Sequence, residues 1–181
     1  MPLFLPQDII AFWHEAGPGR WFDPDPAFDA AMRDKWLPAH EAAARRHLTD
    51  WEEKADGALA LVLLLDQFPR RVFRGTPHAY ATDALAYGVA ARAMAQRFDQ
   101  KFKTPWRRFF YLPFMHSERL EDQERCLDLC RLAGDPEGID ASHIHLDIIK
   151  RFGRFPYRNA ILGRETTPEE QAYLDLGGFG G

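Results

Sequence analysis

The chain has 181 residues, of which 46% are hydrophobic and 13% aromatic, so it can bury a sizeable core and suits one domain spanning residues 1–181. Its net charge of −4 argues against the basic face that binding to nucleic acid usually requires. The sequence shows neither a signal-peptide pattern nor an apolar run of the roughly 18 residues that cross a membrane. We expect a cytoplasmic protein that binds neither nucleic acid nor a membrane.

Helix signals dominate the chain and predict about eight helices. In chain order, their expected ranges are 6–16, 26–48, 55–68, 77–98, 105–112, 117–133, 138–152 and 168–176. Pro38 should kink or split the second helix. The third is apolar on all sides, which places it in the centre of the fold. No alternating apolar pattern indicates a strand, so we expect no sheet.

Short connections between the expected helices favour antiparallel neighbours, so the predicted fold is all-α. A single-domain stack of antiparallel helical hairpins and an irregular helix bundle both satisfy this pattern. Thr167, Pro168 and Glu170 form a capping-box signature at the start of the last helix. The glycine-rich end, residues 177–181, is expected to be a mobile tail unless Phe179 docks.

The motif Phe-Pro-x-Arg occurs twice, at residues 68–71 and 155–158. Pro69 should end the central helix, because proline lacks an N–H donor and restricts the residue before it. Gly153 is well placed to cap the helix before the second copy. Arginines gather in and around both copies, namely Arg70, Arg71, Arg74, Arg154, Arg158 and Arg164.

Two interpretations of these arginines stay open. In the structural one, the guanidinium groups bind the free carbonyl groups at helix C-termini, where cations are also favoured by the helix dipole. In the functional one, the two loops converge on one pocket, because the planar guanidinium fork suits carboxylate and phosphate groups. Repetition of the motif does not decide between them.

Several distinctive segments occur along the chain, namely FW at 12–13, WF at 21–22, LLDQFPRRVFRG at 64–75, YATDALA at 80–86, YLPFMHSE at 111–118, FGRFPYRNAILGR at 152–164 and the final GGFG. These segments, in this order, resemble the DUF924 family of bacterial proteins of unknown function. The resemblance covers nearly the whole chain and implies a helical-repeat fold like that of tetratricopeptide (TPR) proteins. It implies no reaction. No 34-residue TPR spacing is visible, so the TPR-like arrangement rests on the family alone.

Three residues are candidates for acid–base chemistry. His116 stands at the mouth of an expected helix and could move a proton, with Glu118 or Asp66 as its acidic partner. Asp66 ends an otherwise apolar helix, so a buried carboxylate there needs a cation beside it. We expect that partner among Arg70, Arg158 and Arg164.

Two further residues are expected beside the second arginine loop. His145 should face that loop, and Asn159 could orient Arg158 or accept an unusual backbone angle. We expect no metal site, because His143 and His145 point to different sides of a helix and no HExxH or CxxC spacing occurs. The chain also lacks a phosphate-binding glycine loop, and no cofactor is expected.

The leading hypothesis is a non-enzymatic helical protein that binds a peptide or a small anionic ligand. Its concave, arginine-lined pocket would be formed by Arg70, Arg74, Arg154, Arg158 and Arg164, with His145 and Asn159 beside them. The rival is a hydrolase or transferase of a phosphorylated or carboxylated small molecule, in which the arginines hold the anion and His116 moves the proton. The sequence leaves enzymatic activity undecided. It is also compatible with a homodimer.

Overall fold

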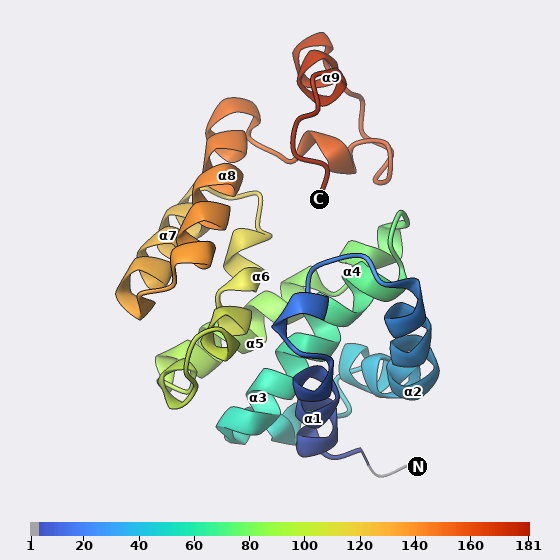
Figure 1. Ribbon diagram of the computed structural model, residues 1–181, viewed down its shortest axis with the longest axis vertical. Helices are drawn as coiled ribbons and strands as arrows, with labels where there is room; N and C mark the ends of the chain where they lie inside the picture. The colour runs from blue at the N-terminus through green and yellow to red at the C-terminus, as the bar shows by residue number, and fades with distance from the viewer. Residues whose placement is uncertain (1–3) are drawn as a thin grey trace. The chain divides into compact units, whose positions relative to one another are not determined.

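The computed structural model describes residues 4–181, and every regular element in that part of the chain is helical (Figure 1). This confirms the all-α prediction. The chain divides into two compact units: unit 1 runs to Arg74 and resumes at His78–Pro113, while unit 2 comprises Gly75–Pro77 and Phe114–Gly181. The one-domain organisation of residues 1–181 stays a prediction. No helix among the described residues is long and apolar enough to cross a membrane.

Unit 1 contains the longest apolar segment and the helices around it. Its helices are α1 (Pro6–Ala16), α2 (Pro26–Ala44), α3 (Ala55–Val62), α4 (Phe68–Val72) and α5 (Asp83–Ala95). Helix α2 begins where the Asp25 carboxylate accepts a hydrogen bond from the Phe28 N–H, at 3.0 Å. Pro38 lies inside α2 without splitting it. The helix ends at Ala44, four residues earlier than predicted, because Arg46 takes a left-handed backbone conformation.

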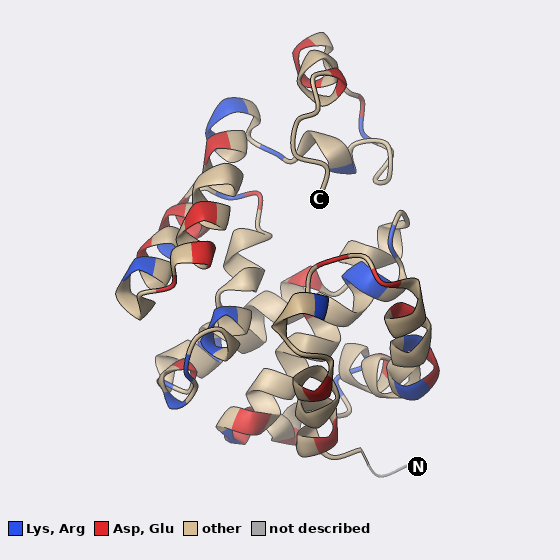
Figure 2. Cartoon of the chain, in the orientation of Figure 1, with Lys and Arg blue, Asp and Glu red and all other residues tan. Residues whose placement is uncertain are grey.

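The centre of unit 1 is the helix that was predicted to be apolar on all sides. Every residue from Gly57 to Pro69 is buried. The stretch from Gly57 to Leu65 carries no charge, and Figure 2 shows it in tan. Before it, a 3₁₀ turn (Thr49–Glu53) packs so closely on α3 that a Cβ at Gly57 would lie 2.1 Å from the Trp51 carbonyl oxygen.

The prediction that Pro69 ends the central helix is wrong. A π-helical turn (Leu63–Gln67) follows α3, and α4 then carries the chain through Pro69 to Val72. Because Pro69 has no N–H, it cannot donate to the carbonyls of the preceding turn. Two side chains from elsewhere in unit 1 donate to these carbonyls instead. The His40 Nδ1–H donates to the Leu64 oxygen at 2.8 Å, and the Thr82 hydroxyl donates to the Leu65 oxygen at 2.5 Å. The helix therefore continues because these carbonyls keep hydrogen-bond partners.

Two more of the expected helices differ from the prediction. The range 77–98 becomes a 3₁₀ turn (Pro77–Tyr80) followed by α5, which begins only at Asp83. The range 105–112 becomes a 3₁₀ turn (Trp106–Phe110), and a short helix, α6 (Leu112–Met115), comes after it. Short 3₁₀ turns of this kind are common connectors at the ends of α-helices.

Unit 2 is built on a pair of neighbouring helices, α7 (Leu120–Ala133) and α8 (Pro136–Phe152), which are joined by a tight turn (Figure 1). Gly134 ends α7 with a φ of 63°, and the Asp135 carboxylate caps α8. Gly153 ends α8 as predicted. The last helix, α9 (Pro168–Asp175), begins with the predicted capping box of Thr167 and Glu170.

The sequence predicted that the glycine-rich end of the chain would be a mobile tail unless Phe179 docks. In the structure, Phe179 docks. The Phe179 ring lies 4.7 Å from the His145 ring and 5.7 Å from the Tyr157 ring, measured between centroids. The Phe179 N–H donates to the Tyr173 hydroxyl at 2.9 Å. A Cβ at Gly178 would lie 2.4 Å from the Tyr173 ring, so any other residue there would have to displace this ring.

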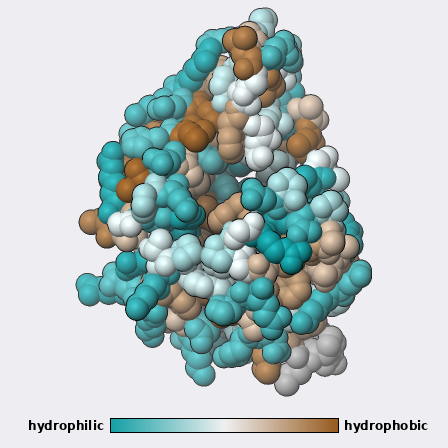
Figure 3. Space-filling view, viewed as in Figure 1, coloured by the Kyte–Doolittle hydropathy of each residue, from teal (hydrophilic) through white to brown (hydrophobic). Residues whose placement is uncertain are grey.

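Apolar side chains on the surface occur in separate places. Figure 3 shows several brown areas among teal and white ones on the face that it displays. Among the described residues, the exposed large apolar side chains are Leu5, Phe22, Leu120, Leu132, Ile144, Leu162 and Leu176. Scattered residues of this kind are ordinary on protein surfaces and do not by themselves mark a docking site.

We predict that His40 makes the stability of the protein pH-dependent. Burial lowers the pKa of His40 below its ordinary value of 6.5, although the hydrogen bond to Leu64 and the charge of Glu41 oppose this shift. His40 therefore binds a proton more readily in the unfolded chain than in the folded one. Its contribution to stability is present above pH 6.5 and is lost as the pH falls below that value.

The measurement is the free energy of unfolding in urea at about pH 7.5 and pH 5.5, for the wild type and for His40→Gln. The wild type should lose more stability between these pH values than the variant, because glutamine does not titrate. Equal losses in the two proteins would contradict the assignment to His40.

Candidate functional site

The first Phe-Pro-x-Arg segment lies in unit 1, where carboxylates bind its first arginine. The Arg70 guanidinium donates to the Asp66 carboxylate at 2.9 Å and to both oxygens of Asp83, at 2.8 and 2.9 Å. Asp66 is fully buried and also accepts a hydrogen bond from the Gln67 amide at 2.6 Å. Arg70 is thus the cation that the buried Asp66 was predicted to need. Arg74 is exposed.

The second Phe-Pro-x-Arg segment lies in unit 2, where a carboxylate binds Arg164. Two nitrogens of Arg164 donate to the two oxygens of Glu118, at 2.7 and 3.0 Å, and the Phe155 N–H donates to the same carboxylate at 2.8 Å. Burial raises the pKa of Glu118, but these hydrogen bonds and the charge of Arg164 outweigh it, so the pKa is lower than the ordinary value. Glu118 is therefore an ionised ion-pair partner at neutral pH.

Asn159 connects this ion pair to a second one. Its amide oxygen accepts from Arg164 Nε at 2.9 Å, and its amide nitrogen donates to Glu170 at 3.2 Å. Glu170 also accepts two hydrogen bonds from Arg154, at 2.6 and 2.8 Å, which lower the pKa of Glu170 to about 2. The expectation that Asn159 orients Arg158 is thus corrected, because Asn159 binds Arg164 instead.

The remaining predicted residues of unit 2 lie among aromatic rings. The Arg158 guanidinium stacks 4.5 Å from the centroid of Phe155 and donates to the Tyr157 hydroxyl. His145 binds the Ala141 carbonyl through Nδ1 at 2.8 Å and packs against Phe155. The His116 and His145 rings lie 6.5 Å apart, between centroids.

The structure thus brings the predicted residues together in two separate groups. Asp66 and Arg70 meet in unit 1, whereas Glu118, Asn159, Arg164 and Arg154 form one connected network in unit 2. Because each Phe-Pro-x-Arg segment lies in a different unit, their convergence on one pocket stays a prediction. The catalytic roles of His116, Glu118 and Asp66 stay predictions as well.

A cavity that the sequence did not indicate lies within unit 1, between the end of α2, the Thr49–Glu53 turn, the central helix and α5. Its volume is about 210 Å³, and it opens to solvent. Leucine and valine side chains form most of its apolar wall, namely Leu48, Leu61, Leu65, Leu85 and Val89. Three charged side chains also line it: Arg46, Glu52 and Arg92.

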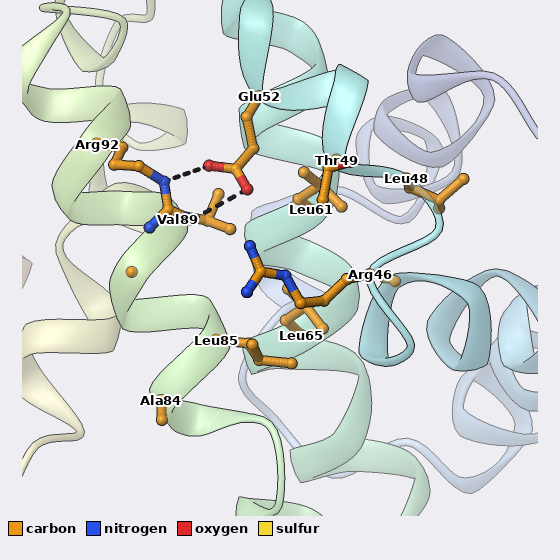
Figure 4. A pocket seen from close by; sticks show the side chains of 12 residues that line it. Arg46, Leu48, Thr49, Glu52, Leu61, Leu65, Ala84, Leu85, Val89 and Arg92 are labelled. Atoms are coloured by element: carbon orange, nitrogen blue, oxygen red, sulfur yellow. Dashed lines mark hydrogen bonds and ion pairs between the residues drawn. The ribbon is translucent and has the colours of Figure 1, made fainter.

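The charged side chains of this cavity are arranged as one ion pair and one additional cation. Arg92 donates to the two oxygens of Glu52, at 2.5 and 3.0 Å. Figure 4 shows the Arg46 side chain reaching from the end of α2, with its guanidinium between this pair and the side chains of Leu65 and Leu85. Among the described residues, 4–181, none forms a hydrogen bond or an ion pair with the Arg46 guanidinium.

The backbone at Arg46 is unusual for its residue type. Its φ is 62°, in the left-handed region that glycine adopts most easily. The conformation closes α2, because the Arg46 and His47 N–H groups donate to the carbonyls of Ala43 and Ala42, both at 2.9 Å. An arginine at such a position costs about 1 kcal/mol relative to glycine.

Comparisons with known proteins identify the family. The family model described as "Bacterial protein of unknown function (DUF924)" matches residues 9–178. The chain belongs to this family. A solved structure, of the protein of unknown function ATU0120 from Agrobacterium tumefaciens, is 51% identical, and the match covers 95% of this chain and 97% of that one, with a TM-score of 0.92. A comparison with curated proteins finds no match.

Membership of the DUF924 family agrees with the resemblance that the sequence predicted, and it names no reaction or ligand. Arg46, Glu52 and Arg92 lie outside the segments on which that resemblance rests. One sequence signal could have indicated Arg46: the residues after α2, Arg45, Arg46 and His47, include no glycine to take the left-handed position that closes a helix.

Proposed function

We propose that this DUF924 protein is a non-enzymatic binding protein for a small carboxylate-bearing ligand, which occupies the cavity of unit 1. The observation that carries this proposal is the Arg46 guanidinium, which lies beside an apolar wall with no carboxylate of its own. A guanidinium can bind a carboxylate through two parallel hydrogen bonds, and leucine side chains suit the apolar part of such a ligand.

Competition favours Arg46 over three of the arginines that the sequence predicted. Arg70, Arg154 and Arg164 each already bind one or more carboxylates of the protein, at distances of 2.6 to 3.0 Å. An incoming anion would have to displace these partners and leave buried carboxylates without a cation, which costs several kcal/mol. No such exchange is needed at Arg46. The size of the cavity favours a small molecule over a peptide.

The backbone of Arg46 makes a matched test of the site possible. Glycine would close α2 with less strain than arginine, by about 1 kcal/mol. Arg97 provides a matched comparison, because it closes α5 with a φ of 56° and the same pair of hydrogen bonds. Arg97 is exposed and does not line the cavity.

The test is a thermal-shift titration with 4-methylpentanoate, compared with chloride at equal ionic strength. The ligand should raise the melting temperature of the wild type and of Arg97→Gly, but not that of Arg46→Gly. Binding at a hundred times the Kd stabilises the folded state by about 2.7 kcal/mol. In the absence of ligand, both glycine variants should be more stable than the wild type by about 1 kcal/mol.

This design separates loss of binding from loss of folding, because the variant expected to lose the ligand is also expected to be more stable. An equal response of Arg46→Gly and Arg97→Gly to 4-methylpentanoate would overturn the proposed site. No response of the wild type to either 4-methylpentanoate or L-leucine would overturn the proposed function.

A further inference from the structure

We infer that the ligand of this cavity is a zwitterion, an aliphatic α-amino acid whose carboxylate binds Arg46 and whose ammonium group binds Glu52. This inference rests on the proposed function and names its ligand class. It comes from the presence of both charges in one small cavity, where Arg46 and Glu52 line the same space with leucine and valine side chains (Figure 4).

Glu52 retains the capacity to bind an ammonium group although it is already paired. An ionised carboxylate has about four acceptor positions, and the two hydrogen bonds from Arg92 occupy two of them. The Glu52 side chain is 20% exposed, so its remaining positions are accessible from the cavity. A ligand ammonium group can therefore bind Glu52 without displacing Arg92.

Arg92 holds Glu52 in place for this role. Gly88 precedes Arg92 by one helical turn on α5, and a Cβ at Gly88 would lie only 3.1 Å from Arg92 Nη1. Glycine in the middle of a helix costs roughly 0.5–1 kcal/mol relative to alanine. Its presence leaves room for the Arg92 guanidinium, which fixes the Glu52 carboxylate with two hydrogen bonds.

Glu52 offers a zwitterion a contact that a purely anionic ligand cannot use. Arg46, Arg92 and Glu52 together carry one net positive charge, so a carboxylate alone is already attracted to the cavity. An ammonium group on the accessible acceptor positions of Glu52 adds a second charge-assisted hydrogen bond to that attraction.

The size of the cavity limits the side chain of the amino acid. A cavity of about 210 Å³ with a wall of leucine and valine side chains suits a small aliphatic amino acid such as leucine. The indole of tryptophan is bulkier and is not aliphatic, so we expect tryptophan to bind at least about tenfold more weakly than leucine. Equal or tighter binding of tryptophan would overturn the aliphatic assignment.

The decisive experiment is isothermal titration calorimetry with three probes that share the leucine side chain. L-Leucine carries both charges, 4-methylpentanoate lacks the ammonium group, and 3-methylbutylamine lacks the carboxylate. We expect leucine to bind at least about tenfold more tightly than either analogue, because each analogue leaves one charged group of the cavity without its ligand partner.

Glu52→Gln tests the ammonium site directly. The variant should lose most of the preference for leucine over 4-methylpentanoate, and it should bind 4-methylpentanoate as tightly as the wild type or more tightly, because a negative charge is removed and Arg92 loses its partner. Glu53→Gln is the control: Glu53 lies in the same turn, is exposed and does not line the cavity, so the preference should remain. A general loss of stability would not change this ratio of affinities.

The outcomes separate this inference from the proposed function. If 4-methylpentanoate binds the wild type as tightly as leucine does, or if Glu52→Gln keeps the wild-type preference, the zwitterion inference is overturned while carboxylate binding stands. If neither leucine nor 4-methylpentanoate binds, both proposals are overturned.

Discussion

Gly57→Ala should lower the free energy of unfolding by about 3 kcal/mol or more, a large effect for the addition of one methyl group. The added Cβ would lie 2.1 Å from the Trp51 carbonyl oxygen and 2.8 Å from its carbonyl carbon. Both are backbone atoms, so no side-chain rotation relieves the overlap. The 3₁₀ turn of Thr49–Glu53 must move away from α3 instead, and it carries Glu52 with it.

The predicted loss of stability is opposite in sign to the effect of helix propensity, because alanine in a helix is otherwise favoured over glycine by about 1 kcal/mol. Urea unfolding of the wild type and the variant measures it. Gly19→Ala is the matched control: a Cβ at Gly19 would have no atom within 4 Å, so its stability should change by less than about 0.5 kcal/mol. A Gly57→Ala protein as stable as the wild type would disprove the close packing of the turn on α3.

Arg71→Met should lower the free energy of unfolding by about 3–5 kcal/mol, because it removes one partner of a buried ion pair. The Arg71 side chain is only 4% exposed and donates to the Asp29 carboxylate at 2.6 Å. It also donates to the carbonyl oxygens of Trp21 and Asp23, at 3.0 and 3.1 Å. Methionine would leave one buried charge and two carbonyls without these donors.

Chemical denaturation again measures this loss, and Arg45→Met serves as the control. Arg45 pairs with Glu41 at 3.4 Å, but both side chains are exposed, at 66% and 48%. Exposed pairs of this kind contribute about 0.3–0.5 kcal/mol. If the two arginine variants lost similar, small amounts of stability, Arg71 would not hold the segment before α2 against α4.

The contrast between Arg71 and Arg46 shows how similar arginines acquire different roles in the same unit. Arg71 lies within the last turn of α4, and Arg46 follows the last turn of α2. The sequences around the two arginines do not differ strongly in charge. Arg71 is buried with one carboxylate and two carbonyls, so its charge is used within the protein. Arg46 is exposed at a cavity, so its charge is available to a ligand.

The sequence by itself determined the helical class and several of the helix boundaries. The capping box of Thr167 and Glu170, the cap at Gly153 and the uncharged stretch from Gly57 to Leu65 were all predictable, and each is observed. These features depend on residues within about one helical turn of one another, or on the apolar character of one segment. Such local relations can be read along the chain.

Only the tertiary structure decided what happens at Pro69 and which groups the arginines bind. The central helix passes through Pro69 because His40 and Thr82 supply donors from other helices, and Arg71 meets Asp29 across 42 residues. The cavity at Arg46 likewise requires α2, α3 and α5 to pack together. Hydrogen bonds and ion pairs act over a few ångströms in space, so their partners are set by folding rather than by separation along the chain.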